Sequence, residues 1–315
     1  MHAIVCGGAG FIGSHLVDRL LREDGVRVTV VDDLSTGRPE NLAGALATGR
    51  VDVRQLSITD PALGDAVAEL RPELIFNLAA QINVRDSVAD PVYDASINIV
   101  GTVALLEAAR HAGVRKVVLA SSVAIYGPPD VLPVTEATPT RPLSPYATSK
   151  LAAEIYLRQF QDLHGLATTT LVLTNTYGPR QFTGGEAGAI AIFADAMLHG
   201  RPTTVFGDGS NTRDYLYVDD AVDAFIRAAG PDGSGLRLNI ATGVETTDLE
   251  LHRAVAAAVG GAPEPTFAPA RLGDLPHMVV DSSAATRVFG WQAQVGLKEG
   301  LARTVESMRR ESGCG

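Results

Sequence analysis

The stretch Ala3-Ile4-Val5-Cys6-Gly7-Gly8-Ala9-Gly10-Phe11-Ile12-Gly13 joins four apolar residues to a glycine-rich loop. The apolar residues predict a buried strand, and residues 14–22 after the loop predict a helix. Glycine at positions 7, 10 and 13 permits a tight turn and a close approach of the backbone to a pyrophosphate group. The N-terminus of the following helix would offer free N–H groups to the same anion. The stretch therefore predicts the first strand, loop and helix of a dinucleotide-binding fold.

The alternation of apolar runs and helical patterns continues through the first two-thirds of the chain. Runs at residues 3–6, 26–31, 51–56, 74–78, 117–120 and 169–173 predict strands. Helical patterns occupy residues 14–22, 61–70, 99–112 and 147–163. Because the strands are apolar nearly throughout, they are typical of a parallel sheet covered on both faces. The sequence predicts an α/β protein built on a Rossmann-type, doubly wound parallel sheet.

The pattern changes after Asn175, where Gly-Pro and Gly-Gly pairs indicate loops. We expect a helix at residues 189–199, a return to the sheet at residues 218–229 and 236–241, a loop at residues 263–276 and a helical cap through residues 297–311. The predicted Rossmann domain covers residues 1–175 plus 218–242. A smaller, discontinuous substrate-binding domain would cover residues 176–217 plus 243–315. The crevice between the two domains is the expected substrate site.

The composition is typical of a folded protein with a large core, since 46% of the 315 residues are hydrophobic and 20% are charged. The net charge of −10 argues against general binding to nucleic acids or acidic membranes. The two cysteines, Cys6 and Cys314, give no disulfide framework, so we expect a cytoplasmic protein. We expect no signal peptide, no apolar run as long as a membrane span and, from the scattered histidines, no metal site.

An acidic pair, Asp32-Asp33, follows the second predicted strand about 20 positions beyond the glycine loop. An acidic side chain here can bind the ribose hydroxyls of NAD and would repel the 2′-phosphate of NADP. We therefore expect NAD as the cofactor. Arg38 lies nearby, so NADP remains an alternative cofactor. The other alternative is that the glycine-rich turn binds no ligand.

The stretch Tyr146-Ala147-Thr148-Ser149-Lys150 places a phenol and an ammonium on one face of a predicted helix. A free phenol has a pKa of about 10. An ammonium about 4 Å away contributes roughly 4 kcal/mol at an effective dielectric of about 20, which would bring the phenol toward neutrality. Ser122 ends a predicted strand 24 residues upstream and could hold a substrate oxygen. The set suits proton removal from an alcohol as its carbon loses hydride; an ordinary exposed helix pair is the alternative.

These residues resemble the extended short-chain dehydrogenase/reductase family, and most closely its nucleotide-sugar 4-epimerase branch. The resemblance covers nearly the whole chain and is carried by residues 7–13, Asp32, Ser122, Tyr146 and Lys150. Further similar motifs are Asp33-Leu34-Ser35-Thr36-Gly37, Asn98 with Gly101-Thr102, Asn175-Thr176-Tyr177-Gly178-Pro179-Arg180, residues 213–220 and residues 271–274. The resemblance implies NAD-dependent 4-epimerisation of a UDP-sugar through a transient 4-keto intermediate, with UDP-glucose and UDP-galactose favoured.

The resemblance also implies a role for each matching residue. Tyr146 would be the base, Lys150 would lower its pKa and bind the nicotinamide ribose, and Ser122 would bind the sugar 4-oxygen. The implied cofactor site comprises Gly7, Gly10, Phe11, Ile12, Gly13, Asp32, Asp33, Ser35, Thr36, Gly37, Ser57, Ile58, Leu78, Ala79, Ala80, Gln81, Asn98, Tyr146 and Lys150. The implied substrate site comprises Ser122, Ala124, Tyr146, Asn175, Thr176, Arg180, Arg213, Arg271, Asp274 and Met278.

The resemblance implies that Arg213 and Arg271 bind the diphosphate and that Asp274 binds the uridine ribose, and guanidinium groups independently suit phosphate oxygens. An ion pair, at the surface or between domains, is the alternative for both arginines.

Three positions depart from the family pattern. Asn77 stands where a His usually begins the fourth-strand motif, Ser57 where an Asp usually binds adenine, and Ala124 where Ser or Thr often lies near the sugar. These changes put the substrate in doubt rather than the fold. The run from Ser122 to Gly127 contains no acid, which ranks 4,6-dehydration and decarboxylation low, because family members with those activities carry a carboxylate there.

The sequence does not decide which sugar the substrate carries. Met278 aligns with a gatekeeping position and is intermediate in size. Hydroxyls of Ser121, Thr174 and Thr176 could receive a C6 carboxylate. UDP-glucuronate, UDP-N-acetylglucosamine and a dTDP-sugar therefore remain alternatives, and so do a nucleotide-sugar dehydratase or reductase and a non-catalytic NAD-binding protein.

The family's equivalents of the helices at residues 99–112 and 147–163 form a four-helix dimer interface, so the resemblance implies a homodimer.

Overall fold

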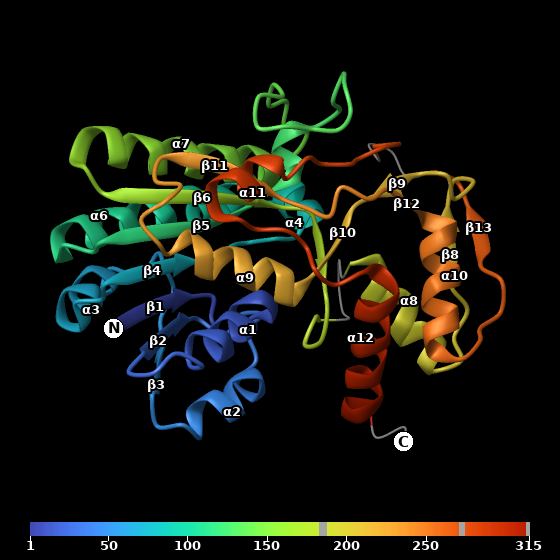
Figure 1. Ribbon diagram of the computed structural model, residues 1–315, viewed down its shortest axis with the longest axis horizontal. Helices are drawn as coiled ribbons and strands as arrows, with labels where there is room; N and C mark the ends of the chain where they lie inside the picture. The colour runs from blue at the N-terminus through green and yellow to red at the C-terminus, as the bar shows by residue number, and fades with distance from the viewer. Residues whose placement is uncertain (183–187, 271–274, 313–315) are drawn as a thin grey trace.

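The computed structural model describes residues 1–182, 188–270 and 275–312. A parallel sheet of seven strands lies at its centre, in the order β11-β6-β5-β4-β1-β2-β3 (Figure 1). Its strands are β1 (His2–Cys6), β2 (Arg27–Asp32), β3 (Val51–Gln55), β4 (Leu74–Asn77), β5 (Lys116–Ser122), β6 (Ala167–Leu173) and β11 (Leu236–Ile240). The predicted Rossmann-type sheet and its six predicted strands are confirmed. The strand order reverses between β1 and β4, which is where doubly wound sheets bind ligands.

Helices cover both faces of the sheet, because successive side chains of a strand point to opposite sides. In β1, Ala3 and Val5 pack into a core shared with α1 (Phe11–Leu20) and α9 (Val218–Ala228). Ile4 and Cys6 pack into a second core with α3 (Leu63–Leu70), α6 (Thr102–Ala112) and α7 (Pro145–His164). All of these β1 side chains are fully buried. The near-continuous apolar runs in the sequence reflect this burial on two sides.

Local capping signals fix the ends of α7. The Ser144 side chain accepts a hydrogen bond from the Ala147 N–H at 3.2 Å, and Pro145 occupies the first turn. The helix ends at Gly165, whose φ of 70° lies in the left-handed region. Serine before a helix, proline in its first turn and glycine after its end are the residues that helix termini favour. These signals decide where Tyr146 and Lys150 stand relative to the sheet.

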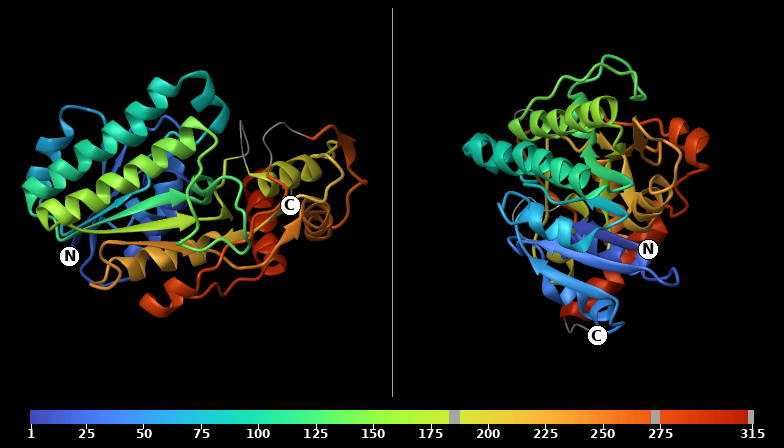
Figure 2. Two further views of the ribbon diagram at one scale, coloured as in Figure 1. Left: turned by 90° about the horizontal axis from the view of Figure 1, so that it is seen from above. Right: turned by 90° about the vertical axis from the view of Figure 1, so that its left-hand side faces the viewer.

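The helix that follows β4 is longer and more irregular than predicted. It runs through α5 (Pro91–Ala95), the π-helical turn η2 (Ser96–Gly101) and α6. The whole run Pro91–His111 is long and apolar enough to cross a membrane, so the expectation that no apolar run has that length is wrong. Here 44% of its most apolar 18-residue window is buried, and α6 packs between α3 and α7 (Figure 2). A core helix meets the same criteria of length and composition.

The remaining elements form a second group beside the sheet (Figures 1 and 2). Three helices, α8 (Ala189–Leu198), α10 (Asp248–Val259) and α12 (Leu297–Ser312), pack on one another. Short strands pair as β7 (Asn175–Tyr177) with β10 (Tyr215–Tyr217), β9 (Thr212–Arg213) with β12 (Thr246–Thr247), and β8 (Thr204–Phe206) with β13 (Thr266–Ala268). The short helices are η1 (Pro39–Leu42), α2 (Ala43–Leu46), α4 (Val84–Ala89), η3 (Val123–Tyr126) and α11 (Ser283–Phe289).

Two expectations about this half need correction. Residues 218–229 return to the sheet as the covering helix α9, and only β11 joins the sheet as a strand. The predicted loop at residues 263–276 contains β13, which pairs with β8. The three-residue β13 is too short to give a periodic signal, whereas α9 is an amphipathic helix whose helical period the prediction from sequence did not use. The division of the chain into two domains at the stated boundaries stays a prediction.

Candidate functional site

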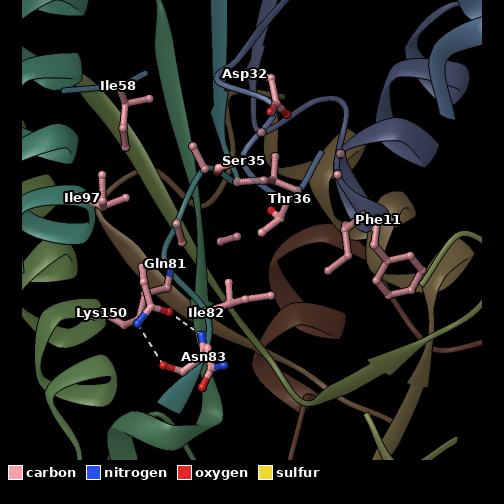
Figure 3. Close-up of a pocket in the computed structure, with 18 of the residues that line it drawn as sticks. Phe11, Asp32, Ser35, Thr36, Ile58, Gln81, Ile82, Asn83, Ile97 and Lys150 are labelled. Carbon is pink, nitrogen blue, oxygen red and sulfur yellow. Dashed lines mark hydrogen bonds between the residues drawn. The ribbon is translucent and has the colours of Figure 1, made fainter. Parts of the chain in front are cut away.

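A cavity of about 580 Å³ opens at the carboxyl ends of the central strands, where the strand order reverses (Figure 3). It is lined mainly by the glycine loop after β1, the acidic loop after β2, the loops after β3 and β4, the carboxyl ends of β5 and β6, and the first turns of α7. The predicted residues that line it are Gly7, Gly10, Phe11, Ile12, Gly13, Asp32, Asp33, Ser35, Thr36, Ser57, Ile58, Leu78, Ala79, Ala80, Gln81, Ser122, Tyr146, Lys150 and Thr176. The structure thus brings most of the predicted cofactor residues and the predicted catalytic residues into one space.

The glycine loop forms a cradle with no room for side chains. Gly7 has a φ of +76°, and a Cβ there would lie 2.7 Å from the Ala79 nitrogen. A Cβ on Gly13 would lie 2.0 Å from the Gly7 carbonyl oxygen. Gly10 caps α1 without a side chain, so the first N–H groups of the helix face the cavity. This cradle fits the pyrophosphate of a dinucleotide, which binds to backbone N–H groups at a helix N-terminus.

Asp32 is held in place by the loops that it joins. Its carboxylate accepts hydrogen bonds of 2.9 Å from the Ala9 and Leu34 N–H groups. A Cβ on Gly37 would lie 2.6 Å from Asp32 Oδ1, so the loop after β2 closes tightly over the carboxylate. Burial raises the pKa of Asp32, and the two backbone hydrogen bonds oppose this rise. A carboxylate fixed at this edge of the cavity suits a ribose diol and disfavours a phosphate.

Ser122, Tyr146 and Lys150 converge on the same cavity from β5 and α7. The Ser122 and Tyr146 side chains are hydrogen-bonded to one another. Burial raises the pKa of Tyr146 and the Ser122 hydrogen bond opposes this, whereas the sequence led us to expect a pKa lowered by Lys150. Burial lowers the pKa of Lys150 to about 8. Burial therefore outweighs the Ser122 hydrogen bond at Tyr146 and the charges of Glu154 and Asp94 at Lys150.

The loop after β4 is fixed by Asn98 and by hydrogen bonds within the loop. The Asn98 side chain accepts a hydrogen bond from the Gln81 N–H and donates one to the Gln81 carbonyl, each at 2.9 Å. The Gln81 side chain in turn bonds to the Asn83 backbone (Figure 3). Asn98 is 2% exposed and does not line the cavity, so its contact with a cofactor would be indirect. It stands in η2, and π-helical turns are often found at functional sites.

A second cavity of about 220 Å³ lies beside the first. Thr176 in β7 lines both, so the two cavities meet at this residue. Asn175 and Arg213 line the second cavity as predicted. Arg213 Nη1 donates hydrogen bonds of 2.7 Å to the carbonyl oxygens of Thr212 and Leu275, which fixes the guanidinium at the cavity wall. An elongated ligand could therefore extend from Tyr146 past Thr176 to Arg213.

Comparisons with known proteins agree with this geometry. Residues 3–241 match the NAD dependent epimerase/dehydratase family. The chain belongs to this family. It is 53% identical over 313 residues to a UDP-glucose 4-epimerase of Mycolicibacterium smegmatis, covering 99% of this chain and 100% of the relative.

Two solved structures are also similar. A UDP-glucose 4-epimerase of Thermotoga maritima with UDP-glucose is 41% identical, with a TM-score of 0.95, over 99% of this chain and 100% of its own. A UDP-glucose 4-epimerase of Thermus thermophilus in complex with NAD is also 41% identical, with a TM-score of 0.90, over 98% of this chain and 99% of its own. The predicted resemblance to nucleotide-sugar epimerases is confirmed, and NAD dependence is a property of the family.

Some predicted residues of this family member lie away from both cavities. Arg180 forms an ion pair with Asp18 of α1, 2.7 Å between Nη2 and Oδ2. Met278 is 3% exposed and packs in a small apolar cluster with Ile125 and Val280. Gly37, Asn98 and Ala124 also line neither cavity. Arg271 and Asp274 lie outside the described residues, so their predicted roles stay predictions.

Most of the other cavity-lining residues were not predicted as site residues, and Ser121 and Thr174 were considered only as partners for a C6 carboxylate. The first cavity adds Val31, Leu56, Ile82, Asn83, Asp86, Tyr93, Ile97, Ala120, Ser121, Leu173 and Thr174. The second adds Tyr177, Gln181, Gly188, Ala189, Ile190, Ile192, Phe193, Thr204, Val205, Phe206, Tyr215 and Asp248. Ile82 and Asn83 directly follow Gln81 beyond β4, so the rule that ligands lie at the carboxyl ends of strands could have found them. Thr204 and Phe206 lie in a three-residue strand that gives no periodic signal.

Proposed function

We propose that this protein is an NAD-dependent UDP-sugar 4-epimerase whose preferred pair is UDP-glucose and UDP-galactose. The observation that carries the proposal is that Thr176 lines both cavities, which therefore lie side by side. A sugar beside Ser122 and Tyr146 would have its nucleotide beside Arg213. The first cavity would then hold the reacting carbon of the sugar, and the second would bind the nucleotide diphosphate. The full-length similarity to UDP-glucose 4-epimerases supports the same reaction.

The side chains of the first cavity have distinct tasks in this reaction. Ser122 would hold the sugar 4-oxygen, and Tyr146 would take the proton of the 4-hydroxyl and later return it. Lys150 would stabilise the phenolate and bind the nicotinamide ribose. When bound, NAD supplies the acceptor and donor of the hydride at C4 and a positive nicotinamide ring. The glycine cradle and Asp32 would hold the cofactor from one turnover to the next.

Inversion requires the 4-keto sugar to present its opposite face. In the proposed reaction the sugar turns about its link to the diphosphate, while the second cavity retains the nucleotide. Arg213 Nη1 is already hydrogen-bonded to backbone carbonyls, so the guanidinium would keep its place while the sugar moves. An epimerase must keep the nucleotide bound while the keto sugar rotates and is reduced again. A dehydrogenase that releases its keto product has no such requirement.

The purified protein, without added cofactor, tests the proposal. It would be incubated separately with UDP-glucose, UDP-glucuronate and UDP-N-acetylglucosamine, and the products resolved by anion-exchange chromatography and proton NMR. We expect UDP-galactose from UDP-glucose and no product from the Tyr146→Phe variant. If no sugar nucleotide is epimerised even after NAD and dTDP-sugars are added, the proposed function is wrong.

Thr174 favours one second candidate substrate, UDP-glucuronate. Its hydroxyl lines the first cavity, is buried, and has no hydrogen-bond partner among the residues that the structure describes. Ser121 and Thr176 line the same cavity, but their hydroxyls already donate to the Glu154 carboxylate and to the Thr174 carbonyl. An unpaired buried hydroxyl next to a reacting sugar could bind a C6 carboxylate. The same incubation separates the two substrates, because only one of them would give a C4 epimer at a useful rate.

We infer that the protein is a homodimer formed through α6 and α7. Apolar side chains are exposed on α7 and on the turns that lead into α6: Ile155 53% and Leu163 74% in α7, Val92 78% in α5 and Val100 61% in η2. A second copy packed against them would remove this surface from water. Light scattering at micromolar concentration tests the inference, and a monomer there would contradict it.

We also infer a cytoplasmic location without a membrane or nucleic-acid partner. Cys6 is a free thiol buried in the sheet, which suits a reducing compartment. The net charge of −10 disfavours binding to nucleic acids. Cell fractionation tests the location, and recovery of the protein in the membrane pellet would contradict it.

A further inference from the structure

Asp94 is a buried carboxylate close to the first cavity that no proposed role yet uses. It stands in α5 and is 0% exposed. Its Oδ1 accepts a hydrogen bond of 3.1 Å from Asn98 Nδ2. Its Oδ2 is buried and has no hydrogen-bond partner within residues 1–182, 188–270 and 275–312. Because an isolated buried charge is costly, a carboxylate in this position calls for a compensating group.

The hydrogen bonds around Asp94 lead directly to the catalytic helix. Asn98 Nδ2 also lies 3.0 Å from the Ser149 hydroxyl, which donates to the Tyr146 carbonyl at 3.0 Å. Ser149 interacts with the Asp94 carboxyl as well. Helix α5 packs against α7, so these contacts join the two helices at the turn that carries Tyr146 and Lys150. Asn98 extends the same network to the cavity-lining backbone of Gln81.

The charges near Lys150 single out Asp94. Two carboxylates act electrostatically on the Lys150 ammonium, Glu154 and Asp94. Glu154 is already compensated, because Arg237 Nε donates to its Oε2 at 2.6 Å and the Ser121 hydroxyl donates to its Oε1. Asp94 has no ion pair with a cation among the described residues, and Lys150 is the charge that acts on it. Lys150 is itself 5% exposed, so the two groups are buried in the same region.

We propose that Asp94 is a positioning residue for catalysis, which holds the first turns of α7 through Asn98 and Ser149 and supplies the counter-charge for the Lys150 ammonium. The inference rests on the proposed roles of Tyr146 and Lys150. It adds a carboxylate on a different helix to the set of Ser122, Tyr146 and Lys150. Without it, the ammonium beside Tyr146 would have only the Glu154 charge, which Arg237 already shares.

The direction of the expected change follows from the charges. Burial lowers the pKa of Lys150 to about 8, and Glu154 and Asp94 both oppose this fall. Replacing Asp94 by a neutral residue removes one opposing charge, so the pKa of Lys150 should fall further. Lys150 would then lose its proton at a lower pH, and activity that needs the ammonium would be lost at a lower pH too. A merely structural role for Asp94 would change stability without this displacement.

Lysine-selective NMR gives the sharpest measurement, because the chain has only three lysines, Lys116, Lys150 and Lys298. The NAD-loaded protein would be labelled with ¹³C-lysine and the Cε shifts followed against pH. In Asp94→Asn we expect the Lys150 titration to move down by about one pH unit. The alkaline limb of the kcat profile should move with it, while KM changes less than about threefold. Lys116 is an internal control, since burial lowers its pKa to about 8 as well.

Asp90→Asn is the matched variant. Asp90 caps the same helix and is exposed, and asparagine also serves as an N-cap. It should leave the Lys150 titration where it is in the wild type. If Asp94→Asn does not give folded, NAD-containing protein, Asp94→Ala replaces it, and added formate should move the Lys150 titration back toward the wild-type value. A Lys150 titration that is unchanged in the neutral variant overturns the proposal, whether or not the protein epimerises UDP-glucose.

Discussion

The two cavities that meet at Thr176 are built in different ways. The larger one is formed mainly by backbone at the ends of long parallel strands, where glycines bring loops into direct contact. The smaller one is formed by side chains on strands of two or three residues, such as Arg213 in β9 and Tyr215 in β10. A backbone cradle tolerates no added atom, whereas a side-chain pocket can lose one group and keep its shape. Substitutions in the glycine cradle should therefore disrupt cofactor binding as a whole, whereas side-chain substitutions elsewhere in the two cavities should remove one contact at a time.

The largest effect is expected for Tyr146→Phe, which removes the acid–base group shared by both half-reactions. We expect kcat to fall by about 10²- to 10⁴-fold, the usual contribution of a positioned acid–base group. The backbone N–H of residue 146 would keep its 3.1 Å hydrogen bond to Ser87, so the helix should stay in place. Epimerisation rates from proton NMR and the NAD content of the purified variant provide the measurement. A variant with normal NAD content and wild-type kcat would contradict the assignment.

The next largest effect is expected for Gly13→Ala in the backbone cradle. The added Cβ would lie 2.0 Å from the Gly7 carbonyl oxygen, so the loop must move and the pyrophosphate site is lost. We expect the NAD content of the purified protein to fall at least about tenfold, with a loss of about 1–3 kcal/mol of stability from overpacking.

Gly44→Ala is the matched control for that variant. Gly44 lies in α2, and a Cβ there meets nothing within 4 Å. NAD content measured by absorbance after protein denaturation should be normal in this control. If Gly13→Ala retained its full NAD content, the glycine loop would have to accommodate the added Cβ without losing the pyrophosphate site, which would contradict the prediction.

The same contrast explains what the sequence could predict. The cradle, Asp32 and the Ser122, Tyr146 and Lys150 set lie at the ends of elements with strong periodic patterns, so their positions in the fold follow from local signals. Thr204, Phe206 and Tyr215 lie in three-residue strands placed by long-range packing, which leaves no period to detect. Arg180 was assigned to the substrate from its motif, but Asp18 on α1 pairs with it. Asp94 gave no signal either, because its burial and its unpaired oxygen exist only in the folded chain.

A smaller effect is expected for Arg213→Ala in the second cavity. Losing a guanidinium contact to a diphosphate removes about 1.5–3 kcal/mol of binding, which corresponds to a rise in KM of about 10- to 100-fold. We expect kcat to change less than about threefold and NAD content to stay normal. Initial rates over a range of UDP-glucose concentrations give both constants.

Arg54→Ala controls for the loss of a positive charge, since Arg54 lies on the far strand β3 and is half exposed. A fall in kcat with unchanged KM in Arg213→Ala would mean that this arginine acts on the reacting sugar rather than on its nucleotide. The contrast between the two cavities would then fail at this residue.

The smallest effect on UDP-glucose is expected for Thr174→Val, which replaces a buried hydroxyl without a described partner by a methyl group of similar size. Removing an unpaired buried polar group is nearly neutral or stabilising, so the thermal stability should be equal or slightly higher. We expect kcat/KM for UDP-glucose to change less than about threefold. If the hydroxyl instead binds a C6 carboxylate, activity on UDP-glucuronate should fall about tenfold or more, because a charged group would lose a hydrogen bond in a buried site. The ratio of the two activities, measured by proton NMR in the same preparation, therefore decides which sugar the first cavity is built to hold.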